Sequence, residues 1–499
     1  MDLIALAPAR PSALWTDRYK LLMAEAGFAI RPERFVLSFR RGGPTYVPLD
    51  LAAWVQALRP TPPTAAELDW VATENGLPMG PGYRHALQKG ELEVSSAPAG
   101  SWVAQHEPLC VVSGPSALVS TVEATLIGTT AFLLQVATLG KKAVMGLLSR
   151  EDLQRRLGRV SCDQEREIVG TVLESVGAPA VKIQVESEAY QESVAARAHT
   201  LVQQVEGGRI AEGGLRSATC PEQHRLAVEA AAQGGIRATS NVQLARELGL
   251  RAVGTTGHEH CQRHFSDLAA FEAAADRIPG DVTLLLDTYD TLSSGIPRAL
   301  EVMERWRGRT LSARPDNEST QERDVRAMVQ GMAERGLDGG IALSGGFDAE
   351  RTARFEALRR ELGRPAHSFS YLYGSHLVRT HIPELPTRSD ASAVFKLCES
   401  AGRPTMKLSS LAGGAPGPKS SKPGRPTIFR AQVLDGSRPP SLIGQHGETP
   451  PAGYAPLQAR ELSAAELQVL AQGSQDSART TSLVKRCLSE RAASIQAQG

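Results

Sequence analysis

The stretch DVTLLLDTYDTLSSGIPRALEVMERWRGRTLSARPD, residues 281–316, decides the expected fold of this chain. The apolar run VTLLL is followed by a helical pattern, IPRALEVMERW, and then by a second short strand pattern, RTLSARPD. A strand, a helix and another strand at this spacing predict a βα unit, in which the two strands lie parallel in one sheet.

The same rhythm runs through residues 207–380. Apolar segments such as IRATSNV, LRAVGTT, GGIALSGG and HSFSYLYG alternate with helical stretches such as CPEQHRLAVEAAAQ and QERDVRAMVQGMAERG. Polar residues follow the strand patterns, at positions 255–258, 287–290, 314–316, 344–348 and 374–376. Because the carboxyl ends of barrel strands form the active-site rim, we predict an α/β fold with an irregular β/α barrel whose site lies there.

The rest of the chain is expected to surround this barrel. We expect a mixed α/β domain over residues 1–142, a helical segment over 143–206, the barrel over 207–385, and a C-terminal segment over 386–499 that packs on the N-terminal domain. The stretch LSSLAGGAPGPKSSKPGRPTIFR is rich in Gly, Pro and Ser, which predicts a loop ahead of short strands.

Composition excludes several classes of protein. With 55 Lys and Arg against 54 Asp and Glu, the net charge of +1 gives no overall electrostatic reason to bind nucleic acid or an anionic membrane. The 6 cysteines are scattered and form no Cys-x-x-Cys pair, which argues against a zinc ribbon and a disulfide scaffold. The first residues lack a secretory pattern, and we expect no apolar stretch of the roughly 20 residues that span a bilayer. We therefore expect a reduced, cytoplasmic protein.

Several side chains at the predicted rim could carry chemistry. His258 follows a Gly-rich strand end and is either a structural histidine or a catalyst, while His260 and His264 are spaced as a metal pair on one helix face. Asp287 and Asp290 could bind Mg²⁺ or ribose hydroxyls or support a cationic transition state. The alternative for this acidic pair is a helix cap at Asp290 in a solvated turn.

Two further groups point to anions. Arg314 suits bidentate recognition of a carboxylate or phosphate, although an ion pair with Asp316 is the structural alternative. ALSGGFD and YLYGSHL are Gly-containing turns between strand and helix, whose backbone N–H groups can hold phosphate, and Ser375 adds a hydroxyl. Together these parts predict a ligand with phosphate, ribose-like hydroxyls and a carboxylate.

The order of motifs resembles the nicotinate phosphoribosyltransferase family over most of the chain. The motifs that carry the resemblance are TDRYKLLMAEAG, FRRGGP, EPLCVVSGP, VEATLIG, GGLRSA, GIRATSNV, VGTTGHEH, LLLDTYDTLSSGIP, RPD, SGGFD, YGSHLV, MKLSS and PGRPTIFR. GTTGHE and DTYDT-x-x-SGIP are the specific ones. Relative to the family pattern, about 45 residues near 143–189 are inserted.

The resemblance implies an activity. Such enzymes join nicotinate to 5-phosphoribosyl 1-diphosphate, giving nicotinate mononucleotide and diphosphate in NAD biosynthesis, with Mg²⁺. They couple this reaction to ATP hydrolysis through a phosphohistidine, and His258 holds that position. The family is dimeric with shared active sites, so a homodimer with no nucleic-acid or membrane partner is expected. Action on another base such as nicotinamide, and a non-catalytic nucleotide-binding paralogue, stay open as alternatives.

The resemblance also implies roles for individual residues. Asp287 would lie beneath the developing oxocarbenium ion, and Tyr19 would stack on the pyridine ring across a dimer interface. Ser240 stands where nicotinamide enzymes have Asp, and a neutral residue there favours nicotinate. The other substrate-binding residues would be Arg216, Thr255, Arg314 and Asp316. The phosphate-binding residues would be Gly345, Gly346, Gly374 and Ser375.

The chain differs from the family pattern at several of these motifs. Gly213 stands in place of the Phe that sandwiches the pyridine ring, and Ser217 in place of a second Arg. Gly346 replaces an acid, for which Asp348 could substitute only if the loop shifts. Leu372 and Tyr373 replace Gly-Val ahead of Gly374, which predicts a narrower approach to phosphate.

Overall fold

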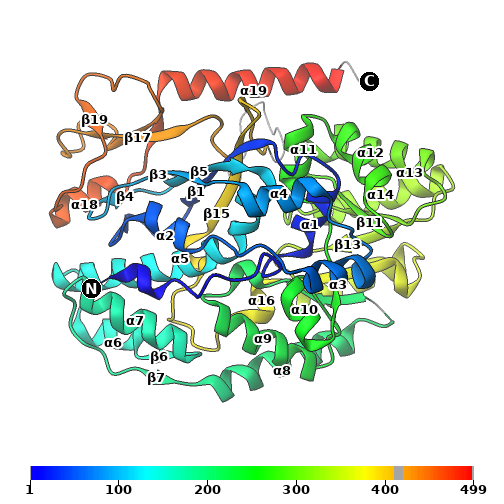
Figure 1. Cartoon of the computed structure of the whole chain (residues 1–499), viewed down its shortest axis with the longest axis horizontal. Coiled ribbons are helices and arrows are strands. Elements are labelled where there is room, and N and C mark those ends of the chain that lie inside the picture. Colours follow the sequence, from blue (N-terminus) through cyan, green and yellow to red (C-terminus); the bar gives the residue numbers. More distant parts are fainter. Residues whose placement is uncertain (1, 208, 409–419, 497–499) are drawn as a thin grey trace.

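A seven-stranded parallel sheet forms the barrel predicted from the sequence. The computed structural model of the chain describes residues 2–207, 209–408 and 420–496 (Figure 1). The sheet order is β10-β9-β8-β14-β13-β12-β11. Its strands are β8 (Arg209–Glu212), β9 (Ala238–Thr239), β10 (Arg251–Ala252), β11 (Val282–Leu285), β12 (Leu311–Arg314), β13 (Gly340–Leu343) and β14 (Phe369–Tyr373). The α/β barrel prediction is confirmed, and only β8 was not expected as a strand.

The sheet curls until its two edge strands meet. Thr256, just after β10, donates from its backbone N–H and from its hydroxyl to the carbonyl of Thr283 on β11, at 2.9 Å each. The backbone N–H of Leu285 donates to the Thr256 hydroxyl at 3.1 Å. One threonine therefore joins both edges and brings the tips of β10 and β11 together.

Helices and short turns connect the barrel strands and cover the outside of the sheet (Figure 1). They are η2 (Leu215–Ser217), α9 (Pro221–Gln233), α10 (Val242–Leu248), α11 (His258–His264), α12 (Asp267–Arg277), the π-helical turn η3 (Thr291–Gly295), α13 (Ile296–Arg305), α14 (Gln321–Glu334), α15 (Ala349–Glu361), η4 (Ala366–Ser368), α16 (Ser375–Val378) and α17 (Arg388–Ala391). Successive strands and helices alternate, as the apolar periodicity predicted.

A second sheet joins the two ends of the chain. Its order is β16-β15-β1-β5-β3. The strands are β1 (Pro32–Phe39), β3 (Glu93–Ser96), β5 (Pro108–Pro115), β15 (Ala393–Ser400) and β16 (Arg403–Pro404). The N-terminal strand β1 pairs antiparallel with both β5 and β15, so the segment after the barrel packs directly on the N-terminal region.

Short elements flank this sheet near the N-terminus. They are η1 (Leu3–Leu6), α1 (Arg18–Glu25), α2 (Leu51–Ala57), α3 (Ala65–Asn75), α4 (Pro81–Lys89) and the two-stranded pair β2 (Thr45–Tyr46) and β4 (Trp102–Val103). Helix α1 reaches the barrel, because the bridge between Asp17 and Asn241 fixes its start there.

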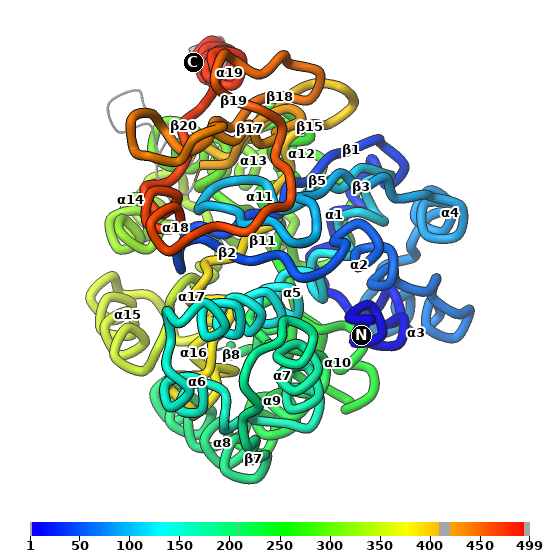
Figure 2. Tube along the Cα trace, turned by 90° about the vertical axis from the view of Figure 1, so that its left-hand side faces the viewer, coloured from blue at the N-terminus to red at the C-terminus, as the bar shows by residue number. Residues whose placement is uncertain are grey.

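The helix α5 (Ser116–Val144) runs through the middle of the molecule (Figures 1 and 2). The expectation that no apolar stretch reaches membrane-spanning length is wrong, because α5 has 29 residues and a mean hydropathy of 1.6 over its best window. That window is 100% buried inside the protein. The helix contacts the second sheet, α7 and the turn η2, so its apolar character serves the core.

The segment near 143–189 adds a small layer at one end of the molecule (Figure 2). It comprises α6 (Arg150–Leu157), β6 (Arg159–Val160), α7 (Asp163–Ser175) and β7 (Gln184–Val185), followed by α8 (Ser187–Gln204). The expected helices are present, and the parallel pair of β6 and β7 is an addition that charge-rich sequence did not reveal.

A third sheet and a long helix end the chain. The sheet order is β19-β17-β18-β20, with β17 (Pro426–Ala431), β18 (Ser441–Gln445), β19 (Tyr454–Pro456) and β20 (Gln475–Asp476). The helices are α18 (Ala464–Leu470) and α19 (Ala478–Gln496), and α19 crosses one side of the molecule (Figure 1). The strands after the Gly/Pro-rich stretch were expected, whereas residues 409–419 of the predicted loop lie outside the described residues.

Candidate active site

His258 lies at the start of α11, at the mouth of the barrel. The preceding Gly257 is in tight contact with α1, because a Cβ there would lie 2.8 Å from a ring carbon of Tyr19. Gly254 is similar, since its Cβ would lie 2.7 Å from the backbone nitrogen of Tyr19. The glycines of the GTTGHE motif therefore let the N-terminal helix approach the histidine.

The imidazole of His258 is held from both sides. Its Nδ1 lies 3.2 Å from the hydroxyl of Thr288, and its Nε2 lies 2.7 Å from Nζ of Lys407. Burial, reinforced by the charge of Lys407, places the pKa of His258 well below its ordinary value, so the ring is neutral. Because an ammonium group only donates, Nε2 carries the lone pair and Nδ1 carries the proton.

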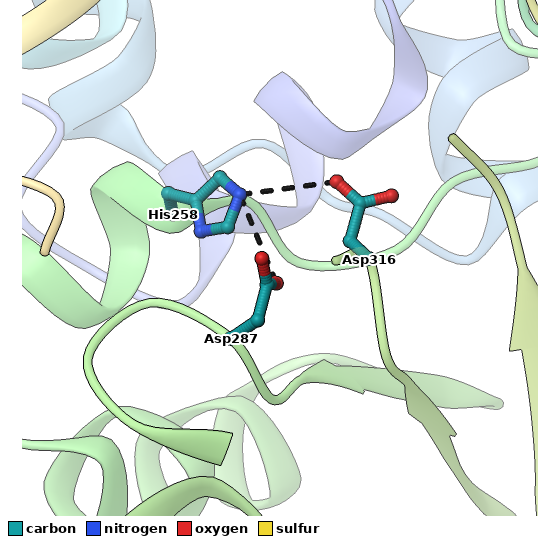
Figure 3. A group of neighbouring side chains, drawn as sticks. All are labelled: His258, Asp287 and Asp316. Carbon is teal, nitrogen blue, oxygen red and sulfur yellow. Dashed lines mark ion pairs between the residues drawn. The ribbon is translucent and has the colours of Figure 1, made fainter. Parts of the chain in front are cut away.

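Two carboxylates face the same imidazole nitrogen (Figure 3). Oδ1 of Asp287 and Oδ2 of Asp316 each lie 3.9 Å from Nε2 of His258. Lys407 Nζ contacts Oδ2 of Asp287 at 3.2 Å, whereas the buried Oδ1 has no hydrogen-bond partner among the described residues. Burial raises the pKa of Asp287, and Lys407 opposes that shift. The three ligand atoms of His258, Asp287 and Asp316 lie within 4.8 Å of one another.

Arg314 connects these acids to the strand end before α11. Its Nη1 donates to Oγ1 of Thr255 at 2.5 Å, and its Nη2 lies 3.7 Å from Oδ2 of Asp316. Ser344, at the end of β13, donates to Oδ1 of Asp316 at 2.5 Å. The structure thus brings the predicted residues of four strand tips into one cluster.

A second cluster, which we call the acceptor group, consists of Asp17, Tyr19, Arg216 and Ser240. The guanidinium carbon of Arg216 lies 5.2 Å from the ring centroid of Tyr19. Asp17 lies between Arg216 and Ser240. Its Oδ2 is 3.0 Å from Nε of Arg216, and its Oδ1 accepts a 2.6 Å hydrogen bond from the hydroxyl of Ser240. Arg216 also interacts electrostatically with Asp316, so the two clusters adjoin.

One expectation about the acceptor group needs correction. Tyr19 packs against Gly254 and Gly257 of its own chain, because α1 is anchored on the barrel, and its stacking across a dimer interface stays a prediction. Ser240 was expected to make the pocket neutral. In the structure the hydroxyl of Ser240 instead donates to the carboxylate of Asp17. The sequence did not predict this contact, because the two residues are 223 positions apart.

The backbone of the first glycine turn favours glycine, but the surroundings of this turn differ from expectation. Gly345 and Gly346 have φ of +81° and +67°, which favours glycine. A Cβ on Gly346 would lie 3.2–3.5 Å from the carboxylate group of Glu318, so an acid adjoins this turn after all. Asp348 does not substitute, since it caps α15 by accepting from the N–H of Arg351 at 2.8 Å.

Of the two bulky residues that precede the turn after β14, only one faces the interior of the barrel. Tyr373 was expected to narrow the approach, but it is buried on the outer side of the barrel, where its hydroxyl lies 2.9 Å from that of Thr352. Gly374 precedes α16, which starts at the half-buried Ser375. Leu372 is the residue that faces inward, against Gly213.

Sequence reasoning missed a set of cations that we call the basic group, namely Arg40, Arg388, Lys396 and Lys407. Burial, with the charges of Lys407, Arg40 and Arg216, lowers the pKa of Lys396 to about 7. Burial beside Arg216 lowers that of Arg388 to about 10. Arg40 lies in the motif FRRGGP and Lys407 in the motif MKLSS, so both motifs were recognised. Nothing in the sequence indicated that these two residues lie at the site.

The remaining candidates have structural roles. Asp290 accepts from the N–H and the hydroxyl of Ser293 at 2.8 and 2.7 Å, which confirms the cap alternative. His260 Nε2 bonds the carbonyl of Ala270 at 2.8 Å and therefore carries the proton. The rings of His260 and His264 pack edge to face with their centroids 4.8 Å apart, and among the described residues no third His, Cys, Asp or Glu joins them in a metal-binding group.

Comparisons with known proteins give a consistent family. No family model matches the chain. Over 268 residues, or 52% of each protein, it is 29% identical to the nicotinate phosphoribosyltransferase pncB2 of Mycobacterium tuberculosis, so the chain spans about half the length of that relative. It is 26% identical to human nicotinate phosphoribosyltransferase over 463 residues, which cover 87% of this chain and 79% of the human protein.

Solved structures show the same fold. The nicotinate phosphoribosyltransferase from Vibrio cholerae superposes with a TM-score of 0.56 at 16% identity, covering 83% of this chain and 92% of that one. The enzyme from Porphyromonas gingivalis gives 0.55 at 18% identity, covering 81% and 95%. The chain is therefore similar in sequence to nicotinate phosphoribosyltransferases over most of its length and shares the fold of the solved ones.

Proposed function

We propose that the chain joins nicotinate to 5-phosphoribosyl 1-diphosphate, forming nicotinate mononucleotide and diphosphate in NAD biosynthesis. Its relatives carry the name of this activity. The observation that carries the proposal is the convergence of His258, Asp287 and Asp316 with Lys407 at the barrel mouth. Acids beside cations suit a transition state in which positive charge develops on a sugar carbon while an anionic group leaves.

The transfer itself needs charge stabilisation of both signs. The pyridine nitrogen forms a bond to C1 of the ribose while the bond from C1 to the diphosphate oxygen breaks, and the leaving group takes the electron pair. Asp287 would stabilise the positive charge that develops on the sugar ring, and the basic group would stabilise the diphosphate. Burial, together with the neighbouring cations, lowers the pKa of Lys396 to about 7, and a bound anion would offset the repulsion among these cations.

The acceptor group would hold the pyridine ring. Tyr19 supplies an aromatic face, and Arg216 supplies a cation for the carboxylate of nicotinate. Asp17 supports a second candidate base, because its carboxylate, already bonded to Ser240, could accept from the amide of nicotinamide. Thr255 and Arg314 would lie on the ribose side, close to Asp316.

His258 would couple the reaction to ATP. A neutral imidazole is a nucleophile, and its free lone pair is on Nε2. In this step Nε2 bonds to the γ-phosphorus of ATP, the bond to the ADP oxygen breaks, and ADP leaves. Water later cleaves the phosphohistidine to inorganic phosphate. Lys407 would move from Nε2 and neutralise the new phosphoryl group.

The acids also fit Mg²⁺. Magnesium prefers oxygen ligands, and Asp287 and Asp316 offer carboxylate oxygens beside a buried Oδ1 that has no hydrogen-bond partner in the described chain. A bound Mg²⁺ would neutralise phosphate charge. His258 would remain a nucleophile, because hard cations rarely take imidazole when carboxylates and phosphates are available.

The 5′-phosphate is proposed to bind at the two glycine turns. Gly345 and Gly346 expose backbone N–H groups next to Asp316, and Gly374 and Ser375 lie on the neighbouring strand end. The adjoining Glu318 would instead accept from ribose hydroxyls.

A direct assay tests the proposed function. Purified protein is incubated with 5-phosphoribosyl 1-diphosphate, Mg²⁺ and either nicotinate, nicotinamide or quinolinate, with and without ATP, and the mononucleotides are separated by chromatography. We expect nicotinate mononucleotide, with faster turnover when ATP is present. Product from nicotinamide instead would select the second candidate base, and ligand binding without any mononucleotide would identify a non-catalytic paralogue.

Assembly and location are proposed on the same basis. We expect a homodimer in the cytoplasm, with light scattering as the test of assembly.

A further inference from the structure

The strand β14 points its side chains alternately out of and into the barrel. The hydroxyl of Tyr371 donates to Glu356 at 2.8 Å and that of Tyr373 lies 2.9 Å from Thr352, both on α15 outside the barrel. Because successive side chains on a strand face opposite sides, Leu372 faces the interior. It is partly exposed, as the last inward residue before the turn at Gly374.

Leu372 fills the space beside Gly213. A Cβ built on Gly213 would lie 2.6, 2.7 and 3.0 Å from Cγ, Cδ1 and Cδ2 of Leu372. Any side chain at position 213 would therefore have to displace the leucine. Both positions differ from the family pattern. Gly213 is smaller than the Phe of that pattern, and Leu372 is larger than its Gly.

The contact lies beside the acceptor group. Gly213 opens the short turn that continues through η2 and presents Arg216, whose guanidinium lies over the ring of Tyr19. On its other side, Leu372 leads through Tyr373 to Gly374, where a Cβ would lie 3.5 Å from the carbonyl oxygen of Gly213. The apolar contact of Leu372 with Gly213 thus lies three residues before Arg216, whose neighbours in the acceptor group are an aromatic ring and a carboxylate.

We propose that Leu372 is a specificity-determining residue, forming the apolar wall against which the edge of a six-membered heteroaromatic acid packs. This inference rests on the proposed function and adds the residue that sets the width of the base. The compact Gly213 and the bulky Leu372 form one unit, in which the leucine occupies the space that the glycine leaves. Rings wider than a single pyridine would collide with its methyl groups.

Kinetics with single variants tests this wall. We expect Leu372→Ala to raise the KM for nicotinate about tenfold, because part of the apolar surface that covers the ring is lost. The KM for 5-phosphoribosyl 1-diphosphate should change less than about twofold, and the two-ring acid quinoline-3-carboxylate should become a better substrate. Leu372→Val should give a smaller rise in the same direction.

Leu343 offers a matched control. It ends the neighbouring strand β13, but it is buried in the apolar core. It pairs with Tyr371, whose hydroxyl bonds α15, so Leu343 shares the outer face of the sheet. Leu343→Ala should lower the melting temperature and leave both KM values within about twofold. An equal rise in the nicotinate KM for both variants would overturn the inference, because general loosening of the barrel would then explain it.

A reciprocal exchange gives the sharpest test. Gly213→Phe alone should lower kcat/KM for nicotinate, since its Cβ already collides with Leu372. In the double variant with Leu372→Gly the ring has room, and kcat/KM should recover to within about threefold of the wild type. If the two losses simply multiply, the positions do not act as a unit and the inference is wrong.

Calorimetric binding separates this inference from the proposed function. Nicotinate mononucleotide is titrated into the wild type and Leu372→Ala without the other substrates. A tenfold weaker Kd for the variant supports the wall even if the wild type shows no turnover, in which case only the proposed function fails. An unchanged Kd together with an unchanged KM, or no binding to the wild type, overturns the wall.

Discussion

The charges behind α11 are fully buried and paired with opposite charges, whereas most of those in front of it are half-buried and lie among other cations. Behind it, Lys20 contacts both Glu123 and Glu259, and Arg263 contacts Glu33 at 3.0 Å. We call these five residues the buried ion network. In front lies the basic group, where the pKa of Lys396 falls to about 7 and that of Arg388 to about 10.

The difference separates an anchor from a binding site. In the network, burial alone would lower the pKa of Lys20, but Glu123 and Glu259 raise it above its usual value, and Lys20 in turn holds that of Glu123 at about 2 despite burial. Each charge there already has its partner. In the basic group several of the neighbouring charges are other cations. A polyanionic ligand would therefore supply the negative charge that pairs with them.

Breaking the network should have the largest effect on stability. Lys20→Met leaves Glu123 and Glu259 buried next to each other without their cation, and removing one partner of a buried pair costs about 3–5 kcal/mol. We expect the free energy of unfolding in urea to fall by that amount. Arg326→Met, which removes surface ion pairs with Glu322 and Glu361, is the control and should cost far less. Equal losses for the two variants would refute the anchoring role.

The anchor also shows what sequence could and could not predict. Strand–helix alternation and the polar residues after each strand identified the barrel and the cluster of His258, Asp287 and Arg314, because these depend on local periodicity. The strand β8 escaped because it begins with the exposed Arg209 and ends with the buried acid Glu212, so no apolar run marks it. The contact between Lys20 and Glu259 joins positions 239 residues apart, and no local pattern announces such a pair.

The basic group was invisible for the same reason. Lys396 and Lys407 come from the segment after the barrel and return to it only through the pairing of β15 with β1. Among 55 lysines and arginines, sequence alone does not show which ones meet at the barrel mouth. The sequence showed Gly213 and Leu372 as two separate differences from the family pattern. Only the structure shows that the two residues are in contact.

In front of α11, removing a cation should harm activity and spare the fold. Lys407→Met removes the ammonium that lies 2.7 Å from His258 and 3.2 Å from Asp287. We expect kcat/KM for mononucleotide formation to fall about a hundredfold, as for the loss of one preorganised electrostatic contact. The melting temperature should fall much less than in Lys20→Met. Lys141→Met, which loses a contact with the exposed Glu461, should keep full activity.

Removing the nucleophile should have a narrower effect. In His258→Ala the acceptor group and the basic group remain, so mononucleotide formation without ATP should persist, while the stimulation by ATP should fall to a ratio of about one. Acid-labile phosphate on the protein after incubation with radiolabelled ATP should disappear as well. Wild-type stimulation in this variant would show that ATP acts elsewhere.

The smallest effect concerns the protonation of Lys396. The charged residues that act on Lys396 are Glu123, Lys407, Arg40 and Arg216. With a pKa of about 7 it loses its charge as pH rises through neutrality, so the KM for 5-phosphoribosyl 1-diphosphate should rise severalfold between pH 6 and 8. Lys396→Met should have a higher KM that changes less over this range. A wild-type KM that falls with pH would contradict this assignment.

The same residue should also give stability a pH dependence of definite sign. In the unfolded chain the lysine keeps its proton up to its ordinary pKa of 10.5, whereas in the folded protein it loses the proton near pH 7. Between these values the unfolded state binds more protons, so the contribution of Lys396 to the free energy of unfolding becomes more favourable as pH rises. Lys396→Met should therefore be more stable than the wild type at pH 6.5, and urea unfolding should show this advantage shrinking towards pH 9.5. An advantage that grows with pH would place Lys396 with the paired charges of the network instead.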